Sequence, residues 1–185
     1  MKKVTLLSFF VFSTLAGFSQ VIFGVKGGLN LATFTGNDVE NAKFLPSFHV
    51  GGLVNFLVTD KVTIQPEVLF SGKGAKSDQG TFKFGYIDVP VLVQYNIQGF
   101  YLEAGPQVGF LVNAKRKVSG QTSNAKDIVK STDFSWVGGI GYKTLSGFGA
   151  GARYDFGFYN VANQGIIRNK AIMISLFYTF HTSEE

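Results

Sequence analysis

The sequence contains no cysteine, and its 185 residues include only two histidines, two methionines and one tryptophan. The lack of cysteine excludes disulfides, thiol chemistry and a lipid-modified cysteine anchor, and it fits a protein exported to an oxidising compartment. His49 and His181 lie far apart in the chain, so we propose no transition-metal site and expect no cofactor. Charge is sparse too, at 16% of residues with a net value of +5, which is poor support for nucleic-acid binding.

Helical periodicity, heptads and linker-like segments are also lacking after residue 20, so we expect a single domain over residues 20–185. The first 19 residues form a different kind of segment. Lys2 and Lys3 precede a run of apolar and small residues over 4–17, and Gly17 and Ser19 place small side chains before Gln20. This pattern predicts a cleaved secretory signal peptide over residues 1–19, because the run is too short for a spanning helix.

Alternation of apolar and polar residues fills the rest of the chain. It predicts eight strands, at residues 22–31, 47–58, 62–71, 84–96, 99–112, 132–144, 148–158 and 169–180. The connections alternate between long (32–46, 72–83, 113–131, 159–168) and short (59–61, 97–98, 145–147). This rhythm is typical of an all-β, eight-stranded antiparallel up-and-down transmembrane β-barrel, with short periplasmic turns and long extracellular loops.

The glycines indicate which face of the sheet is inside. Ten of them fall on the polar face: Gly24, Gly28, Gly51, Gly105, Gly109, Gly139, Gly141, Gly149, Gly151 and Gly157. Only Gly27, Gly52 and Gly138 fall on the apolar face. A soluble barrel, the alternative, has no reason to lose side chains from a water-facing surface, whereas the lumen of an eight-stranded barrel is barely wide enough for side chains. We therefore expect a lipid-facing apolar surface and a polar, crowded lumen.

Three prolines, Pro66, Pro90 and Pro106, interrupt the predicted strands, and each removes a ladder hydrogen bond. Counted outward from the turns, all three lie at nearly the same height on adjacent strands. We therefore expect a bulged, locally bent band there, after which the inward parity shifts.

Six charged residues fall on the lumen face: Lys26, Glu67, Asp88, Glu103, Arg153 and Asp155. Counting along the hairpin places Glu67 roughly opposite Asp88, where two carboxylates require a nearby cation. The favoured interpretation is an ion network that fills and stiffens the barrel. The alternatives are a path for protons or ions and, less well supported, an acid–base catalytic pair.

His49 is the one histidine within the predicted barrel, on the lumen face. Ser47, Ser71 and Asp88 are its candidate partners for nucleophilic chemistry, and some lipid-modifying enzymes of the outer membrane are barrels of this size. A lone histidine outside any motif is more often a hydrogen-bonding lumen residue. We assign no catalytic residue.

The predicted loops are basic, with Lys73, Lys76 and Lys83 in one and Arg168 and Lys170 near the last. The longest loop, 113–131, is polar and is the candidate partner-binding segment. Its cations are Lys115, Arg116, Lys117, Lys126 and Lys130. Phosphates of lipopolysaccharide in the outer leaflet are one candidate partner for them, by charge attraction.

Five segments resemble the PorT-type small outer-membrane β-barrel family: residues 24–31 (GVKGGLNL), 64–70 (IQPEVLF), 86–91 (YIDVPV), 101–107 (YLEAGPQ) and 149–154 (GAGARY). The resemblance covers nearly all of residues 22–180. It implies an eight-stranded outer-membrane barrel, and it implies that the three prolines belong to the family pattern. The family's namesake is an accessory to a system that secretes proteins across the outer membrane, and no catalytic residues come with the resemblance.

Three functions are therefore compatible with the sequence. The first is a non-enzymatic outer-membrane protein that binds a partner, either a secretion complex or lipopolysaccharide, through its loops or its periplasmic rim. The second is a narrow pore, and the third is a lipid-modifying enzyme that uses His49. The crowded lumen favours the first.

Overall fold

The computed structural model describes residues 21–36, 42–77, 80–118, 121–126, 129–161 and 167–180. The predicted signal peptide, residues 1–19, lies outside this range. Nine strands are present in it: β1 (Val21–Thr35), β2 (Lys43–Leu57), β3 (Val62–Ser77), β4 (Gly80–Ile97), β5 (Phe100–Val118), β6 (Gln121–Asn124), β7 (Thr132–Lys143), β8 (Phe148–Gly157) and β9 (Arg168–Thr179). No helix among these residues is long and apolar enough to cross a membrane, a result that has no bearing on spanning strands.

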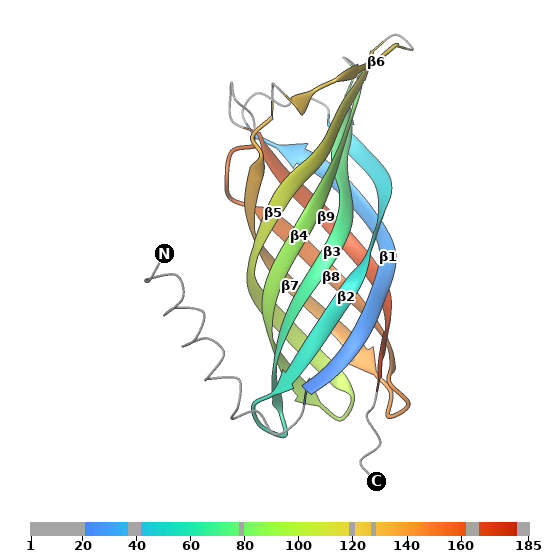
Figure 1. Cartoon of the computed structure of the whole chain (residues 1–185), viewed down its shortest axis with the longest axis vertical. Helices are drawn as coiled ribbons and strands as arrows, with labels where there is room; N and C mark the ends of the chain where they lie inside the picture. Colours follow the sequence, from blue (N-terminus) through green and yellow to red (C-terminus); the bar gives the residue numbers. More distant parts are fainter. Residues whose placement is uncertain are drawn as a thin grey trace, which may run out of the picture.

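Eight of the strands close into one antiparallel barrel, as the alternation predicts (Figure 1). Each strand pairs with the next, β9 pairs with β1, and the β4–β5 pairing completes the ring. The short strand β6 pairs with β5 beyond the ring. Closure satisfies the backbone hydrogen bonds of every edge, which lipid cannot do. The turn between β4 and β5 has positive φ at Gln98 and Gly99, the geometry that suits a two-residue hairpin.

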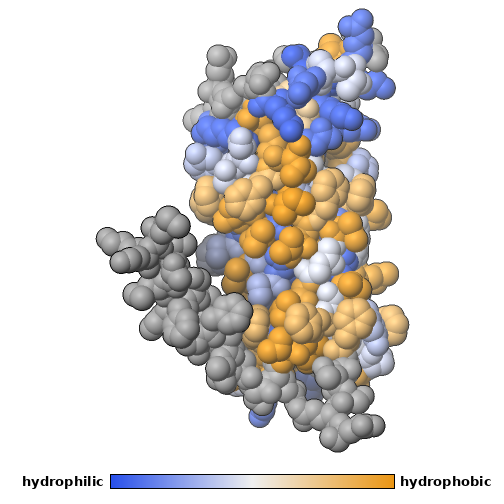
Figure 2. Space-filling model, viewed as in Figure 1, coloured by the Kyte–Doolittle hydropathy of each residue, from blue (hydrophilic) through white to orange (hydrophobic). Residues whose placement is uncertain are grey.

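The outer wall of the barrel is apolar over most of its height (Figure 2). Large side chains such as Leu29, Phe100 and Leu176 are more than 60% exposed, and Trp136 is about half exposed. An apolar surface of this extent is not stable in water but matches a lipid environment. Aromatic rings pair near the lower rim, where Phe100 packs against Tyr142 and Phe148 against Tyr178.

The glycines face the lumen as predicted, and the backbone explains why. A Cβ at Gly28, Gly51 or Gly105 would lie 2.0 Å from a carbonyl oxygen of the neighbouring strand. At Gly138, which faces outward, a Cβ would meet nothing within 4 Å. The inward glycines therefore permit strands and lumen side chains to approach closely, which a narrow barrel needs.

Two predicted loops are wrong, because the strands continue above the membrane. The segment 72–83 is almost entirely strand: β3 runs to Ser77, and β4 starts at Gly80. In 113–131, β5 continues to Val118, and β6 then pairs back onto it. Outside the hydrocarbon core the outer wall need not be apolar, so strand pairing continues where the apolar alternation has stopped.

The expected bulge at the prolines is also wrong. Pro66 pairs with Val91, and three residues further on Leu69 pairs with Asp88 at the same offset, so no residue is inserted between them. The register across Pro90 and Pro106 is likewise constant. A proline removes one backbone N–H donor from the strand pairing, but this loss does not require an inserted residue. The same alternate residues therefore face the lumen on both sides of each proline. The register shifts lie elsewhere, between Phe44 and His49 and between Gly85 and Tyr86.

Candidate functional site

The first part of the site is a network of ionised lumen side chains that we call the basal ion cluster: Lys26, Glu67, Glu103 and Arg153. The Nζ atom of Lys26 lies 2.6 Å from Glu67 Oε1. Arg153 donates to both oxygens of Glu67, at 2.7 and 2.8 Å, and to both oxygens of Glu103. Gln65 and Gln94 donate to the same two carboxylates. Two cations thus balance two carboxylates in a buried setting, the condition under which such pairs are tolerated.

Glu67 does not lie opposite Asp88, which corrects the prediction. Asp88 pairs across the hairpin with Leu69, two residues further along β3. The two carboxylates therefore belong to separate clusters, each with a cation of its own. Glu67 contacts Lys26 and Arg153, whereas Asp88 contacts Lys73.

The second network, the upper ion cluster, consists of Lys73, Asp88, Asp133 and Asp155. Lys73 Nζ lies 2.9 Å from Asp155, 3.1 Å from Asp88 and 3.6 Å from Asp133. Gln107 donates to Asp155 at 2.9 Å, and Asn169 donates to Asp133 at 2.8 Å. A single ammonium thus holds together three carboxylates that are each at most 1% exposed.

Lys73 and Asp133 were missed as lumen residues. The sequence predicts a loop at Lys73, although its position follows the inward period of two from Glu67 through Leu69 and Ser71. Extending that period past residue 71 identifies it. Asp133 lies at the start of β7, next to the predicted loop. It is two residues from Ser135 and four from Val137, which both face the lumen, and this spacing identifies it as a lumen residue.

His49 lies in a hydrogen-bonded chain within the lumen. Its Nδ1 is 2.6 Å from Asn30 Oδ1, and its Nε2 is 2.8 Å from Ser175 Oγ. Since Asn30 Oδ1 can only accept, neutral His49 donates from Nδ1 and accepts the Ser175 hydroxyl proton at Nε2. Of the predicted partners, Ser71 is reached only through Asn30, while Ser47 donates to a backbone carbonyl and Asp88 belongs to the upper ion cluster. All three members of the chain are at most 3% exposed.

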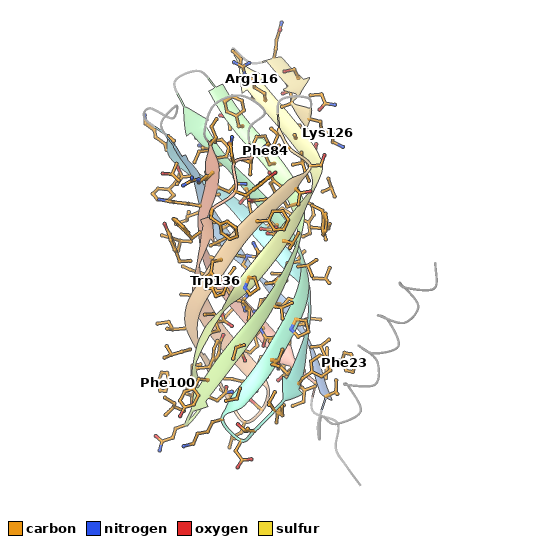
Figure 3. The ribbon with its side chains drawn as sticks, turned by 90° about the vertical axis from the view of Figure 1, so that its left-hand side faces the viewer. Phe23, Phe84, Phe100, Arg116, Lys126 and Trp136 are labelled. Carbon is orange, nitrogen blue, oxygen red and sulfur yellow. The ribbon has the colours of Figure 1, made fainter. Side chains whose placement is uncertain are left out.

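Apolar layers cover the ion clusters at both ends of the lumen. At the end of the barrel that carries the short turns, Leu53, Tyr101 and Phe177 pack together, with the Tyr101 and Phe177 rings 6.1 Å apart. The extracellular layer, which we call the apolar cap, lies near the upper end, where Figure 3 labels Phe84. Its buried members and the residues packed against them are Phe84, Tyr86, Ala114, Ala125, Val129, Val161, Phe34, Phe82, Leu111 and Ile167. Buried side chains of the described residues therefore occupy the lumen at both ends and between them.

The candidate partner-binding cations are found in three settings. Lys115 and Lys117 are exposed on the outer face of β5, which is strand at that point rather than loop. Arg116 points the other way and lies over the Phe82 ring of the apolar cap, 5.4 Å from its centroid. Lys126 is exposed beyond β6, and Lys130 lies 4.6 Å over the Tyr159 ring. Figure 3 shows Arg116 and Lys126 near the upper end of the barrel, beside β6. Within the described ranges, no group of acidic or histidine side chains could hold a metal ion.

An apolar outer wall, a closed ring of eight strands and a charged, filled lumen define a small membrane-spanning barrel of the outer-membrane type. The chain belongs to the outer membrane protein beta-barrel domain family, whose model matches residues 16–163. It is accordingly a protein of the outer membrane. No curated protein matches the chain in sequence.

Solved structures show the same fold at low sequence identity. Neisserial surface protein A is 13% identical with a TM-score of 0.60, over 85% of this chain and 97% of that one. Ail, the attachment invasion locus protein of Yersinia pestis, is 15% identical with a TM-score of 0.54, over 87% and 99%. Ail has also been solved in complex with the heparin analogue sucrose octasulfate, at 14% identity and the same TM-score, over 87% and 99%.

Proposed function

We propose that this protein is a non-conducting, non-enzymatic barrel that acts by binding a partner at its extracellular end. The observation that carries the proposal is the filled lumen. Two ion clusters and two apolar layers occupy it, and an eight-stranded barrel has no further width for a solute path. A barrel that has no solute path through its lumen and no reactive group within reach of a substrate is left with its outer surface for function.

The distribution of charge favours the extracellular end as the binding surface. Of the cations predicted for partner binding, Lys115, Lys117 and Lys126 are exposed there. Figure 2 shows hydrophilic side chains gathered above the apolar band at that end. The similarly folded Ail binds a polysulfated sugar in one structure, which supports a polyanionic partner for this chain as well.

The enzyme alternative is weaker. The Ser175–His49–Asn30 chain has the hydrogen-bond order of a nucleophile, a base and an orienting residue. A substrate would have to reach Ser175, which is 3% exposed beneath a filled lumen. We therefore assign these residues to the internal hydrogen bonding of the barrel.

The PorT-type segments support a more specific role, as an accessory to protein secretion across the outer membrane. In this form of the proposal the partner at the rim is a component of the secretion machinery. We also propose that residues 1–19 are removed before Gln20 during export, on the basis of their charge and small-residue pattern.

Site-specific photocrosslinking in intact cells tests the proposal. A photoreactive residue at Lys126 is expected to give adducts of higher mass, because this exposed position lies at the extracellular end. The control is the same residue at Ile140, which is exposed on the apolar outer wall near the opposite end of the barrel. Protein adducts from Lys126 identify a secretion partner, and polysaccharide adducts identify lipopolysaccharide. The mass of the recovered barrel also reports whether it begins at Gln20.

Equal adduct patterns from Lys126 and Ile140, with neither protein nor polysaccharide captured at the rim, would contradict binding at this end. A heat-shifted gel band for each variant establishes that both barrels are folded.

A further inference from the structure

The outer face of the strand extensions carries cations placed directly beside one another. Lys83 of β4 pairs with Lys115 of β5, and Lys43 of β2 pairs with Lys76 of β3. Thr81 connects the second pair to Lys117, because it pairs with Lys76 on one side and Lys117 on the other. Five exposed lysines thus form two adjacent rows across four strands. We call this set the lysine array: Lys43, Lys76, Lys83, Lys115 and Lys117.

The array has no counterions among the described residues. Five of the acidic residues in those ranges, Glu67, Asp88, Glu103, Asp133 and Asp155, are buried in the lumen. The sixth, Asp60, lies in a turn at the opposite end of the barrel. Every ion pair in the described part of the chain belongs to the two lumen clusters.

Like charges directly opposite each other on neighbouring strands are unfavourable. An anion bound between two such pairs would reduce the repulsion within both of them. The lysines stand on paired strands, so their spacing is fixed by the backbone ladder. Rows two residues apart are separated by about 7 Å along a strand.

The position of the array relative to the membrane identifies the anion. Its lower row, Lys83 and Lys115, lies on the same face as Ile87 and Phe110, four and five residues nearer the membrane. The Phe70 ring lies over Gly85, two residues below Lys83, since a Cβ there would be 3.3 Å from it. Phe70 in turn packs against Phe48. Aromatic rings with cations directly above them are typical of the boundary between acyl chains and head groups.

We infer that the lysine array binds the phosphate groups of lipid A, the lipopolysaccharide anchor in the surrounding outer leaflet. The array faces sideways, on the continuation of the lipid-facing wall, and a membrane lipid reaches such a face more directly than a soluble ligand does. Lysine ammonium groups bind phosphate as point charges and need no single geometry. This inference rests on the proposed function, and it names one partner of the extracellular end.

Binding of lipid A to the full-length exported protein in nanodiscs tests the inference. The nanodiscs contain phosphatidylcholine with a minority of bisphosphorylated lipid A, and native mass spectrometry of the released barrel counts bound lipids. We expect the unmodified protein to retain lipid A above its share of the bilayer. Lys83→Gln/Lys115→Gln should reduce this enrichment by about tenfold, because each lysine near an anionic surface contributes separately. Lys43→Gln/Lys76→Gln should act in the same direction.

The matched control is Lys61→Gln/Lys143→Gln, which removes the same charge at the periplasmic end and should leave the enrichment unchanged. Three results would overturn the inference. They are equal enrichment of dephosphorylated lipid A, equal enrichment in the Lys83/Lys115 variant, and array-dependent binding of soluble heparin without any enrichment of lipid A. The last result would leave binding at the extracellular end intact, so the two proposals fail separately.

Discussion

Replacing Lys73 by Met is expected to destabilise the barrel by at least about 3–5 kcal/mol, the cost of breaking a buried ion pair by removing one partner. Lys73 is the ammonium that contacts Asp88, Asp133 and Asp155. Without it Asp155 and Asp133 keep one amide donor each, from Gln107 and Asn169, and the buried Asp88 carboxylate loses its ion-pair partner. Urea unfolding of the protein in lipid vesicles, followed by the fluorescence of the single tryptophan, Trp136, measures the loss.

Lys76→Met is the matched control, because Lys76 lies three residues further along β3 and is exposed. Its free energy of unfolding should stay within about 0.5 kcal/mol of the unmodified protein. Adding Asp88→Asn and Asp155→Asn to Lys73→Met should restore part of the stability, since both changes remove uncompensated charge. Equal stability of the Lys73 and Lys76 variants would show that the upper ion cluster does not stabilise the fold.

The second large effect is expected at Gly51. A Cβ on this residue would lie 2.0 Å from the carbonyl oxygen of Val68 and 2.8 Å from the Cα of Leu69. Neither atom belongs to a movable side chain, so Gly51→Ala must displace β3 relative to β2. The cost is expected to be about 1–3 kcal/mol or more, as for other overpacked interiors. The urea midpoint in vesicles and the temperature at which the heat-shifted gel band is lost both report it.

Gly138→Ala supplies the comparison, because its Cβ would point to open space on the lipid-facing wall. We expect no loss of stability there. If Gly51→Ala and Gly138→Ala unfold at the same urea concentration, the close approach of strands in the lumen is not what requires glycine.

The barrel itself was predictable because lipid imposes a pattern on the sequence. Each spanning strand must place apolar side chains outward, so the strands can be counted from alternation alone. The uneven placement of glycines then identified the lumen face, and residues such as Gly28 and Gly51 show the reason in their contacts. Loss of one donor at Pro66 left the register unchanged, so parity also held beyond the prolines.

The upper part of the molecule was less predictable, for a physical reason. Beyond the hydrocarbon core the outer wall is not selected to be apolar, so β3, β4 and β5 continue without a regular apolar outer face, and the sequence predicts a loop at Lys73. The apolar cap could not be recognised either. Residues such as Ala125 and Val161 lie in irregular segments and meet Phe84 only once the barrel has closed.

The ion pairs that cross the lumen could not be predicted from the sequence either. Lys26 and Glu67 are 41 residues apart, and Arg153 and Glu67 are 86 apart. The alternation along each strand shows that these residues face the lumen. Which of them make contact depends on the diameter of the barrel and on the relative shift of its strands. The basal ion cluster joins β1, β3, β5 and β8, so it is complete only in the closed barrel.

Planar bilayer recording tests the central claim most directly, that the lumen is filled and the protein acts through its surface. Purified, folded protein inserted into a bilayer is expected to give no conductance steps at any applied voltage, because the ion clusters and the apolar cap occupy the lumen. Protease protection of the same protein preparation in lipid vesicles establishes separately that it inserts. Reproducible steps of constant size from the folded protein would contradict the account and would identify the barrel as a narrow pore.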